Sequence, residues 1–340
     1  MRTLSLALAL LAATFLPVRA DDTDASLNAG NLVLDRGGAI TLVAEDLHLS
    51  EQGVRTDYRF RNPTDADIEA TLVFPMPDIV GAPGTAVSIP EPAQANFLAF
   101  DATVDGRTVP WQLEQHAFLM RDGQPAEVSD DLEGLGIPLV PTVAATAVPL
   151  RLLPERRRLA LIAAGFLDRQ VHEDGTISDV PLWTLTSRFR HRQVFPAGKE
   201  VAIRQSFTPS LGGRSSLAFG SPDLGPTQMA RYSERFCTDP TFARSAQTLY
   251  RRSSADGSRS FEAYEQYLTY VVPAGVGAIG TFRLVVDKGD PATMVAFCGS
   301  NLRKTGPTTV EMVVKDFVPH RDIDVLFLKS APRVSAWPPL

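Results

Sequence analysis

Apolar and polar side chains alternate along residues 54–61, and this pattern constrains the fold more than any other feature of the chain. A period of two is typical of a β-strand with one buried and one exposed face. After a polar turn at 62–65, the alternation resumes along residues 68–74 and ends at Pro75 and Pro77. Two such strands joined by a short turn predict an antiparallel hairpin. Because the apolar face of this hairpin needs a second sheet to cover it, we expect a β-sandwich.

The N-terminus has the three parts of a secretory signal peptide. Arg2 supplies a positive charge, residues 4–16 form an apolar core, and small residues precede a cleavage site between Ala20 and Asp21. We therefore expect residues 1–20 to be removed and the protein to be periplasmic or secreted; the alternative is a buried N-terminal helix. No cysteine comes directly after the apolar core and no later stretch reaches about 20 apolar residues, so the sequence predicts neither a lipid anchor nor a transmembrane span.

Charge and length narrow the class of protein further. The formal net charge is −6, and it becomes −8 when the two arginines of residues 1–20 are removed. A mildly acidic chain argues against nucleic acid as a partner, because nucleic acids bind basic surfaces. At roughly 150 residues per domain, the remaining length suggests about two domains.

Strand patterns and changes of composition divide the chain into two β-rich parts with a helical segment between them. The expected segments are an N-terminal β-sandwich over 21–118, a helical and loop connector over 119–179, a C-terminal β-rich domain over 180–330 and a tail over 331–340. A helix start at Ser129 and the helix formers after Pro154 favour the connector. Asp239 followed by Pro240 predicts one further helix near 239–252. The predicted fold class is mostly β, with two β-sandwich-like domains, a helical connector and one further helix in the second domain.

The two cysteines, Cys237 and Cys298, both lie in the C-terminal half of the chain. In an oxidising compartment a single pair is most simply explained by a disulfide bond. Two buried thiols are the alternative, and the absence of a Cys-x-x-Cys motif argues against a redox site. No cofactor is predicted from any motif.

The candidate catalytic and metal-binding residues are scattered along the sequence. None of the histidines has another His, Cys or acid at a spacing typical of zinc sites: His48, His116, His172, His191 and His320. No Gly-x-Ser-x-Gly motif is present, and Leu211–Arg214 lacks the ending of a phosphate-binding loop, which favours a surface loop there. Asp130 and Asp131 fit the first turn of a helix, where the helix dipole favours acids.

Three charged stretches could bind a ligand, although each has a simpler explanation. Arg156–Arg158 could meet an anionic lipid or glycan, and a solvated helix face is the alternative. Arg251 and Arg252 form a second short basic cluster. Asp287–Gly289 ends a predicted strand, where a structural hairpin corner is favoured over a ligand site.

Motifs along nearly the whole chain together resemble a secreted proteobacterial family known as domain of unknown function 4424. The motifs are Tyr58–Asn62, Val73–Asp78, Val194–Gly198, Ser206–Pro209, Phe236–Cys237, Asp239, Phe282, Leu284–Gly289, Phe297–Gly299, Lys304, Pro307–Thr308, Phe317–Pro319 and Asp324–Leu328. The resemblance implies secretion and a β-rich fold, and it implies no activity. The chain departs from the family at Pro273–Val276, which lacks a tryptophan found in relatives. Phe60–Asn62, Phe74–Pro77 and Phe100–Arg107 also resemble the inter-alpha-trypsin vault domain, a β-sandwich.

These observations favour a periplasmic or secreted protein that binds without catalysis or serves as a structural part of the envelope. Its partner would be an envelope protein or polysaccharide, contacted through loops such as 78–92 and 209–226. The alternative is an envelope-directed hydrolase with its site at the domain junction. A carboxylate hydrogen-bonded to His172, His191 or His320 in a pocket would favour the hydrolase. A large apolar patch on an edge strand would favour the structural role.

Overall fold

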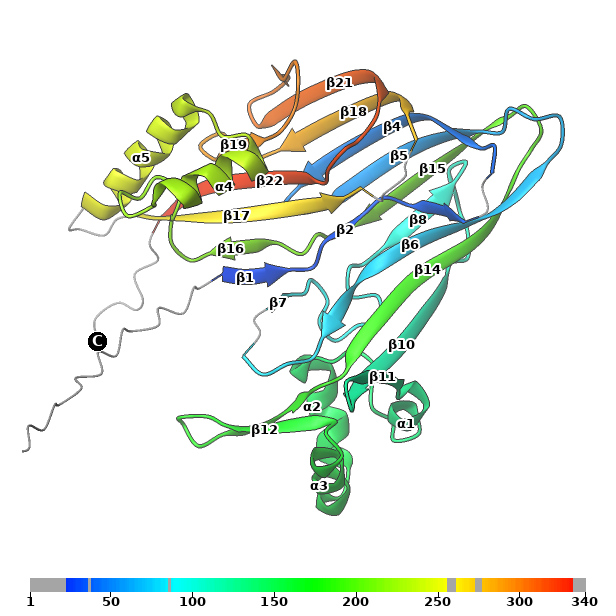
Figure 1. Cartoon of the computed structure of the whole chain (residues 1–340), viewed down its shortest axis with the longest axis vertical. Coiled ribbons are helices and arrows are strands. Elements are labelled where there is room, and N and C mark those ends of the chain that lie inside the picture. The colour runs from blue at the N-terminus through cyan, green and yellow to red at the C-terminus, as the bar shows by residue number, and fades with distance from the viewer. Residues whose placement is uncertain (1–22, 36–37, 85–86, 256–260, 273–276, 333–340) are drawn as a thin grey trace, which may run out of the picture.

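The structure of the chain is a computed structural model that describes residues 23–35, 38–84, 87–255, 261–272 and 277–332. The described residues are mostly β, with several sheets and no closed barrel, and their helices gather at two ends of the molecule (Figure 1). The fold class predicted from alternation is therefore confirmed as mostly β. The expected signal peptide with its Ala20–Asp21 cleavage site, the Pro273–Val276 turn and most of the expected tail lie outside the described residues.

An eight-stranded sheet contains the strand from which the fold was predicted. Its strands, in spatial order, are β20 (Arg303–Lys304), β21 (Thr309–Phe317), β18 (Ile279–Asp287), β4 (Thr41–Ser50), β5 (Val54–Arg61), β15 (Glu200–Phe207), β8 (Asp101–Val104) and β9 (Arg107–Thr108). The pairing of β4 with β18 is parallel. Along β5 the residues Val54, Thr56, Tyr58 and Phe60 are buried, as the alternation predicts.

A second sheet of seven strands packs against the first. Its strands are β19 (Met294–Phe297), β22 (Ile323–Pro332), β17 (Phe261–Val271), β16 (Gly212–Arg214), β1 (Thr23–Ser26) and β7 (Val87–Ser88), with β2 (Ala29–Gly30) parallel to β17. One core cluster joins Tyr58 and Phe60 of the first sheet to Leu268 and Phe327 of the second. A second layer therefore covers the apolar face of β5, as expected.

A third sheet of five strands extends away from these two layers (Figure 1). Its strands are β11 (Gln124–Glu127), β10 (Gln112–Arg121), β14 (Thr184–Phe195), β6 (Ile68–Val80) and β3 (Val33–Asp35). The alternation predicted for 68–74 is confirmed, since Ala70, Leu72 and Phe74 are buried. The prediction that Pro75 and Pro77 end the strand is wrong, because β6 stays paired with β14 as far as Val80.

The predicted hairpin between β5 and β6 is also wrong. The two strands belong to different sheets, and the turn between them is a corner where the chain passes from one sheet to another. The connection from β14 to β15 also passes between these two sheets, and it lies next to the corner between β5 and β6. Asn62 holds the two corners together, because its buried amide donates to the carbonyl oxygens of Ala66 and Phe195, each at 2.8 Å. The Asn62 backbone N–H donates to the Lys199 carbonyl oxygen at 3.1 Å.

Strands from distant parts of the sequence share these sheets. β4 pairs with β18, β5 with β15, and β6 with β14. The predicted boundaries near residues 118 and 180 therefore lie between strands that pair with each other. Alternation identifies which face of a strand is buried, but it does not identify the partner strand.

The predicted connector forms one end of the molecule. It contains α1 (Ser129–Glu133), α2 (Val143–Leu152), α3 (Glu155–Ala163) and a hairpin of β12 (Leu167–Val171) with β13 (Ile177–Pro181). These elements share a small core around Trp183, whose indole N–H donates to the Leu139 carbonyl oxygen at 2.7 Å. No helix in the described ranges is long and apolar enough to span a bilayer.

The other helical end contains α4 (Pro226–Phe236) and α5 (Pro240–Ala255), which lie against β17, β19 and β22 (Figure 1). The helix predicted near 239–252 is confirmed, and the Asp239 carboxylate accepts the Phe242 N–H at 2.7 Å. Sequence analysis missed α4, although Met229, Tyr232 and Phe236 have helical spacing and contribute to the core. The predicted disulfide is present: Cys237 ends α4, Cys298 follows β19, and their Cα atoms lie 5.0 Å apart.

Candidate functional site

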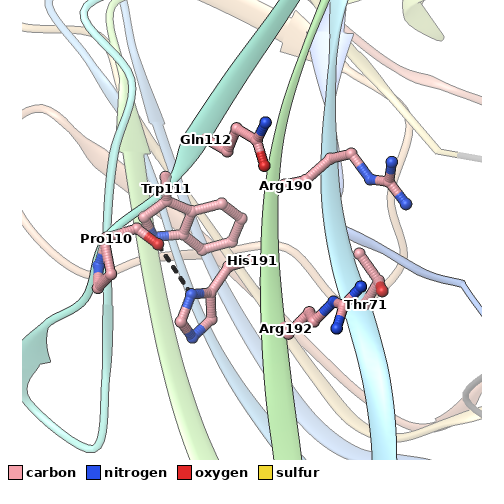
Figure 2. A pocket seen from close by; sticks show the side chains of 7 residues that line it. All are labelled: Thr71, Pro110, Trp111, Gln112, Arg190, His191 and Arg192. Carbon is pink, nitrogen blue, oxygen red and sulfur yellow. Dashed lines mark hydrogen bonds between the residues drawn. The ribbon is translucent and has the colours of Figure 1, made fainter.

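The strongest candidate for a ligand site is a pocket of about 380 Å³ where β10 begins beside β14. We call it the Trp111 pocket, and its lining residues are Thr71, Pro110, Trp111, Gln112, Arg190, His191 and Arg192 (Figure 2). Three separate stretches of sequence meet there. In Figure 2 the rings of Trp111 and His191 lie on one side of β14, and Arg190 and Arg192 extend toward the other side, where Thr71 lies.

Strand alternation explains why polar groups gather in this place. Arg190 and Arg192 continue the period of two of the exposed Thr186 and Arg188 along β14, so they share an outward face. Gln112 lies opposite Arg190 on β10, and Thr71 lies opposite Arg192 on β6. Directly opposite residues share a face of a sheet, so amide, hydroxyl and guanidinium groups lie together.

Two aromatic rings form the wall of the Trp111 pocket. The Trp111 ring lies 5.4 Å from the His191 ring and meets Phe100 edge to face at 5.3 Å. The His191 Nδ1–H donates to the Pro110 carbonyl oxygen at 2.9 Å, because a carbonyl oxygen can only accept. The Trp111 indole N–H is covered and has no hydrogen-bond partner within the described chain. Leaving such a donor unpaired costs about 1–3 kcal/mol.

The balance of charge in the Trp111 pocket is positive. Glu114, just outside the lining, accepts hydrogen bonds from Arg188 at 2.7 Å and Arg190 at 3.0 Å. These two bonds lower the pKa of Glu114, and the bond from Arg188 has the larger effect. Arg192 has no ion pair or hydrogen bond within the described ranges, and no carboxylate there lines the pocket. The pocket can therefore accept an anionic group without displacing an existing acid.

A second polar assembly is buried between the eight-stranded and seven-stranded sheets. We call it the intersheet cluster; its members are Asn31, Glu45, Thr56, Tyr58, Gln205 and Tyr270, all buried. Gln205 Nε2 donates to the Tyr58 hydroxyl at 2.8 Å, and the Tyr58 and Tyr270 hydroxyls lie 3.2 Å apart. The Tyr58 hydroxyl also donates to Asn31 Oδ1 at 3.1 Å. These bonds join side chains from both sheets.

Glu45 is the acid of the intersheet cluster, and its pKa is shifted. Burial raises its pKa to about 8, and hydrogen bonds with Tyr270 and Asn31 oppose this shift. Its Oε2 atom is buried without a partner in the described structure. A perturbed pKa can mark a catalytic acid. However, Glu45 is only 1% exposed, and it lines none of the pockets described here, so a structural role explains it better.

Glycine packing closes the intersheet cluster further. The Gly30 carbonyl oxygen accepts from Gln205 Nε2 at 3.0 Å. A Cβ atom on Gly30 would lie 1.8 Å from the Val271 carbonyl oxygen, so only glycine fits at this strand contact. The close contact between the Gly30 and Val271 backbones leaves the intersheet cluster enclosed.

The structure does not gather the histidines. His191 lines the Trp111 pocket, His172 contacts the Ser178 hydroxyl at 2.8 Å, and neither bonds a carboxylate within the described residues. His320 also lacks such a bond there. His116 pairs with Glu127 at 2.7 Å, but both side chains are exposed. The part of the chain that the structure describes holds no group of acids, histidines and cysteines that could bind a metal.

The remaining candidates mostly have structural roles. Asp130 and Asp131 lie in the first turn of α1. The surface loop predicted for Leu211–Arg214 is wrong, because Gly212 and Gly213 are buried in β16. A Cβ atom on Gly212 would lie 2.2 Å from the Tyr267 ring, which explains the glycine.

The predicted corner at Asp287–Gly289 borders a pocket of about 430 Å³. The Asp287 carboxylate accepts the Gly289 N–H at 2.9 Å, and the Lys288 ammonium donates to the carbonyl oxygen of Pro291 at 2.6 Å. Burial, and then the charge of Lys304, lower the pKa of Lys288. Because the ammonium group is bonded within its own turn, this pocket offers less to a ligand than the Trp111 pocket does.

Sequence analysis named His191 but missed the other residues of the Trp111 pocket and all of the intersheet cluster. The pocket depends on which strands are neighbours, and the sequence does not show that. Glu45 left a signal, because it falls in phase with the buried Leu47 and Leu49 of β4. A charged residue on the apolar face of a strand is a sign of a buried polar group.

Comparison with known proteins gives distant structural similarities. No curated protein matches the chain. One similar structure is a candidate nutrient-binding protein from Legionella pneumophila, with 12% identity, a TM-score of 0.48, and coverage of 90% of this chain and 72% of that chain. Another is an M1 zinc metallopeptidase from Deinococcus radiodurans, with 10% identity, a TM-score of 0.23, and coverage of 85% and 42%. Both TM-scores lie below 0.5, so neither similarity bears on function.

The family comparison is far more extensive. The model of a family described as a domain of unknown function, DUF4424, matches residues 20–326. This range includes the Trp111 pocket, the intersheet cluster and the disulfide. The chain belongs to the DUF4424 family.

Proposed function

We propose that this protein is a non-catalytic binding protein of the periplasm or the cell exterior, and that the Trp111 pocket binds an anionic group of an envelope polysaccharide. The N-terminal signal pattern and the Cys237–Cys298 bridge support the location, because disulfides persist in oxidising compartments. A purely structural role in the envelope would leave the Trp111 pocket without a ligand.

One observation carries the proposal: the charged side chains that line the pocket are the guanidinium groups of Arg190 and Arg192, with no acid among the lining residues. Arg192 is unpaired within the described chain, and Arg190 is only partly neutralised by Glu114. Guanidinium groups bind carboxylates and sulfates through charge-assisted hydrogen bonds. The rings of Trp111 and His191, across β14 from these guanidinium groups, add an apolar face to the same pocket, and this combination suits a sugar acid.

Calorimetric titration tests the proposal with tetragalacturonic acid as the probe and maltotetraose as the neutral comparison. We expect saturable binding of the acidic probe, weakening as salt is added, and no binding of maltotetraose. Arg192→Ala should weaken binding about tenfold, which corresponds to about 1.4 kcal/mol. Arg59→Ala is the matched control, since Arg59 is also exposed on a strand but lies outside the pocket.

Equal weakening by Arg192→Ala and Arg59→Ala would assign the binding to general surface charge and refute the site. Equal binding of the acidic and neutral probes would refute the anionic ligand.

The hydrolase alternative has its best support at His116, whose bond to Glu127 lies beside a pocket of about 550 Å³. The Ser129 hydroxyl donates to Glu127 at 3.2 Å, so it is bonded to the acid rather than to the histidine. A nucleophilic serine would instead give its proton to the histidine. Hydrolysis of envelope polysaccharide by the wild type, lost in His116→Ala, would overturn the non-catalytic proposal.

A further inference from the structure

The tip formed by α2 and α3 carries exposed apolar side chains that its own core does not use. We call this surface the α2–α3 tip and define it as Val148, Arg151, Leu152, Arg156, Arg157 and Leu159. Leu152 is 81% exposed, Val148 55% and Leu159 49%. Single exposed apolar residues are common on proteins, but three on two adjoining short helices form a local concentration.

Helical spacing places these side chains away from the protein core. Val148 and Leu152 are four residues apart, so they lie on the same face of α2. The buried residues Thr146 and Leu150 of α2, also four apart, lie on the opposite face toward the protein. In α3 the buried Leu161 is two residues from Leu159 and so faces away from it. In Figure 1, α3 extends beyond the sheets at the end of the molecule. The tip is therefore open to a partner from outside.

Unpaired positive charge surrounds the exposed apolar side chains. Arg151, Arg156 and Arg157 are exposed and make no ion pair within the described ranges. Their neighbour Arg158 differs, because it is paired with Glu155 and lies 3.9 Å from Asp179. The Glu155 carboxylate also accepts a hydrogen bond from Arg169 at 3.3 Å, so this acid is already paired with arginines.

We propose that the α2–α3 tip docks on a bilayer that contains anionic lipid. Interfacial helices bind by inserting leucine-type side chains at the headgroup boundary while arginines contact lipid phosphates. The tip supplies both components next to each other. Because α3 projects beyond the sheets in Figure 1, the tip can reach a broad charged surface.

The neighbouring β12–β13 hairpin marks the limit of this surface. Val171 and Ile177 are paired across the hairpin and exposed by 71% and 62%. However, the turn between them carries Glu173 and Asp174, whose charges would be repelled by anionic lipid. The proposed contact is therefore confined to the two helices.

Vesicle sedimentation tests the docking surface with the chain from Asp21 onward. The vesicles are phosphatidylcholine alone, or phosphatidylcholine with phosphatidylglycerol at about three to one. We expect at least tenfold stronger binding to the anionic vesicles, lost at high salt because exposed charges are screened. Leu152→Ser with Leu159→Ser should weaken this binding about tenfold, and Arg151→Gln with Arg156→Gln and Arg157→Gln should abolish the preference for anionic vesicles.

The matched control is Val313→Ser with Val318→Ser, because these residues are exposed by 43% and 44% on and after β21, outside the tip. It should bind vesicles as the wild type does, and all variants should keep the wild-type melting temperature. Failure of the wild type to sediment with anionic vesicles would overturn the proposal. A tip that binds another protein instead of lipid would give this result. Equal binding by wild type and tip variants would also overturn it.

Discussion

The intersheet cluster and the Trp111 pocket combine the same kinds of side chain with opposite results. Each contains aromatic rings, an amide and a charged or chargeable group. In the intersheet cluster, hydroxyl and amide groups bond to one another, and Tyr58 and Tyr270 are inaccessible to solvent. In the Trp111 pocket, donors exceed acceptors and the space between them is open.

This difference indicates what each region contributes. A closed network whose donors find partners inside the protein can affect stability but offers nothing to a ligand. An open set of donors with no acid gains most of its energy only when an anion arrives. The buried acid Glu45 therefore marks a structural region, while Arg190 and Arg192 mark the proposed binding region.

The largest expected effect is the pH dependence that Glu45 gives to stability. Its pKa is about 8 in the folded protein against 4.5 for an ordinary glutamate, so the folded state keeps a proton that the unfolded state has lost. The contribution of Glu45 to stability should be fully present below about pH 4.5 and fall by about 1.4 kcal/mol per pH unit up to about pH 8. The total loss from this group is on the order of 5 kcal/mol.

Glu45→Gln should remove this slope, which denaturant unfolding at pH 5 and pH 8 measures. The variant should gain stability relative to the wild type as the pH rises. A wild-type slope that survives in Glu45→Gln would show that other groups cause it. Weaker ligand binding in the variant would show that the intersheet cluster takes part in function after all.

The next largest effect is expected from the disulfide, which lies outside both regions. Closing a loop between residues 61 apart stabilises by about 4 kcal/mol on the chain-entropy estimate. Cys237→Ser with Cys298→Ser should lower the free energy of unfolding by about this amount. Binding of tetragalacturonic acid should be unchanged under conditions where the variant remains folded. A loss of binding in the folded variant would break the separation between stability and binding.

Tyr270→Phe should cost about 1–3 kcal/mol, because it leaves buried partners such as Thr56 and Tyr58 short of a hydroxyl. Thermal unfolding measures the loss, and titration with the acidic probe should give the wild-type affinity. Tyr250→Phe, on α5 and outside the cluster, is the matched control. Equal melting temperatures for the two variants would contradict the assigned hydrogen bonds.

Trp111→Phe should have the smallest effect on stability and a clear effect on binding. It removes a buried indole N–H that has no partner in the described structure, and the gain of about 1–3 kcal/mol is opposed by the lost packing of the larger ring, so the net change in the free energy of unfolding should be small. Affinity for tetragalacturonic acid should fall several-fold. A large loss of stability with unchanged affinity would reverse the roles assigned to the two regions.

The sequence predicted individual strands far better than their neighbours. Alternation correctly identified the buried faces of β5 and β6. It could not separate a hairpin from a corner between sheets, because both need a polar turn such as 62–65. The difference depends on Asn62, whose amide binds Phe195 from a distant strand.

The candidate site was mostly hidden for the same reason. Thr71, Trp111 and Arg192 lie on separate stretches, and only the pairing of β6 and β10 with β14 brings them together. Arg192 looks in the sequence like an ordinary residue on an exposed strand face. The disulfide was predicted correctly because two cysteines in an oxidising compartment leave only one intramolecular pairing.

The most direct test of the proposed site is a nitrogen–proton NMR titration of the indole N–H groups with tetragalacturonic acid. Trp111 and Trp183 report on different surroundings, because the Trp183 N–H is already bonded to Leu139 and buried. The account predicts a saturable shift of the Trp111 signal, assigned by its loss in Trp111→Phe, while the Trp183 signal stays in place. A Trp111 signal that does not move at saturating probe, or one that moves equally with maltotetraose, would contradict it.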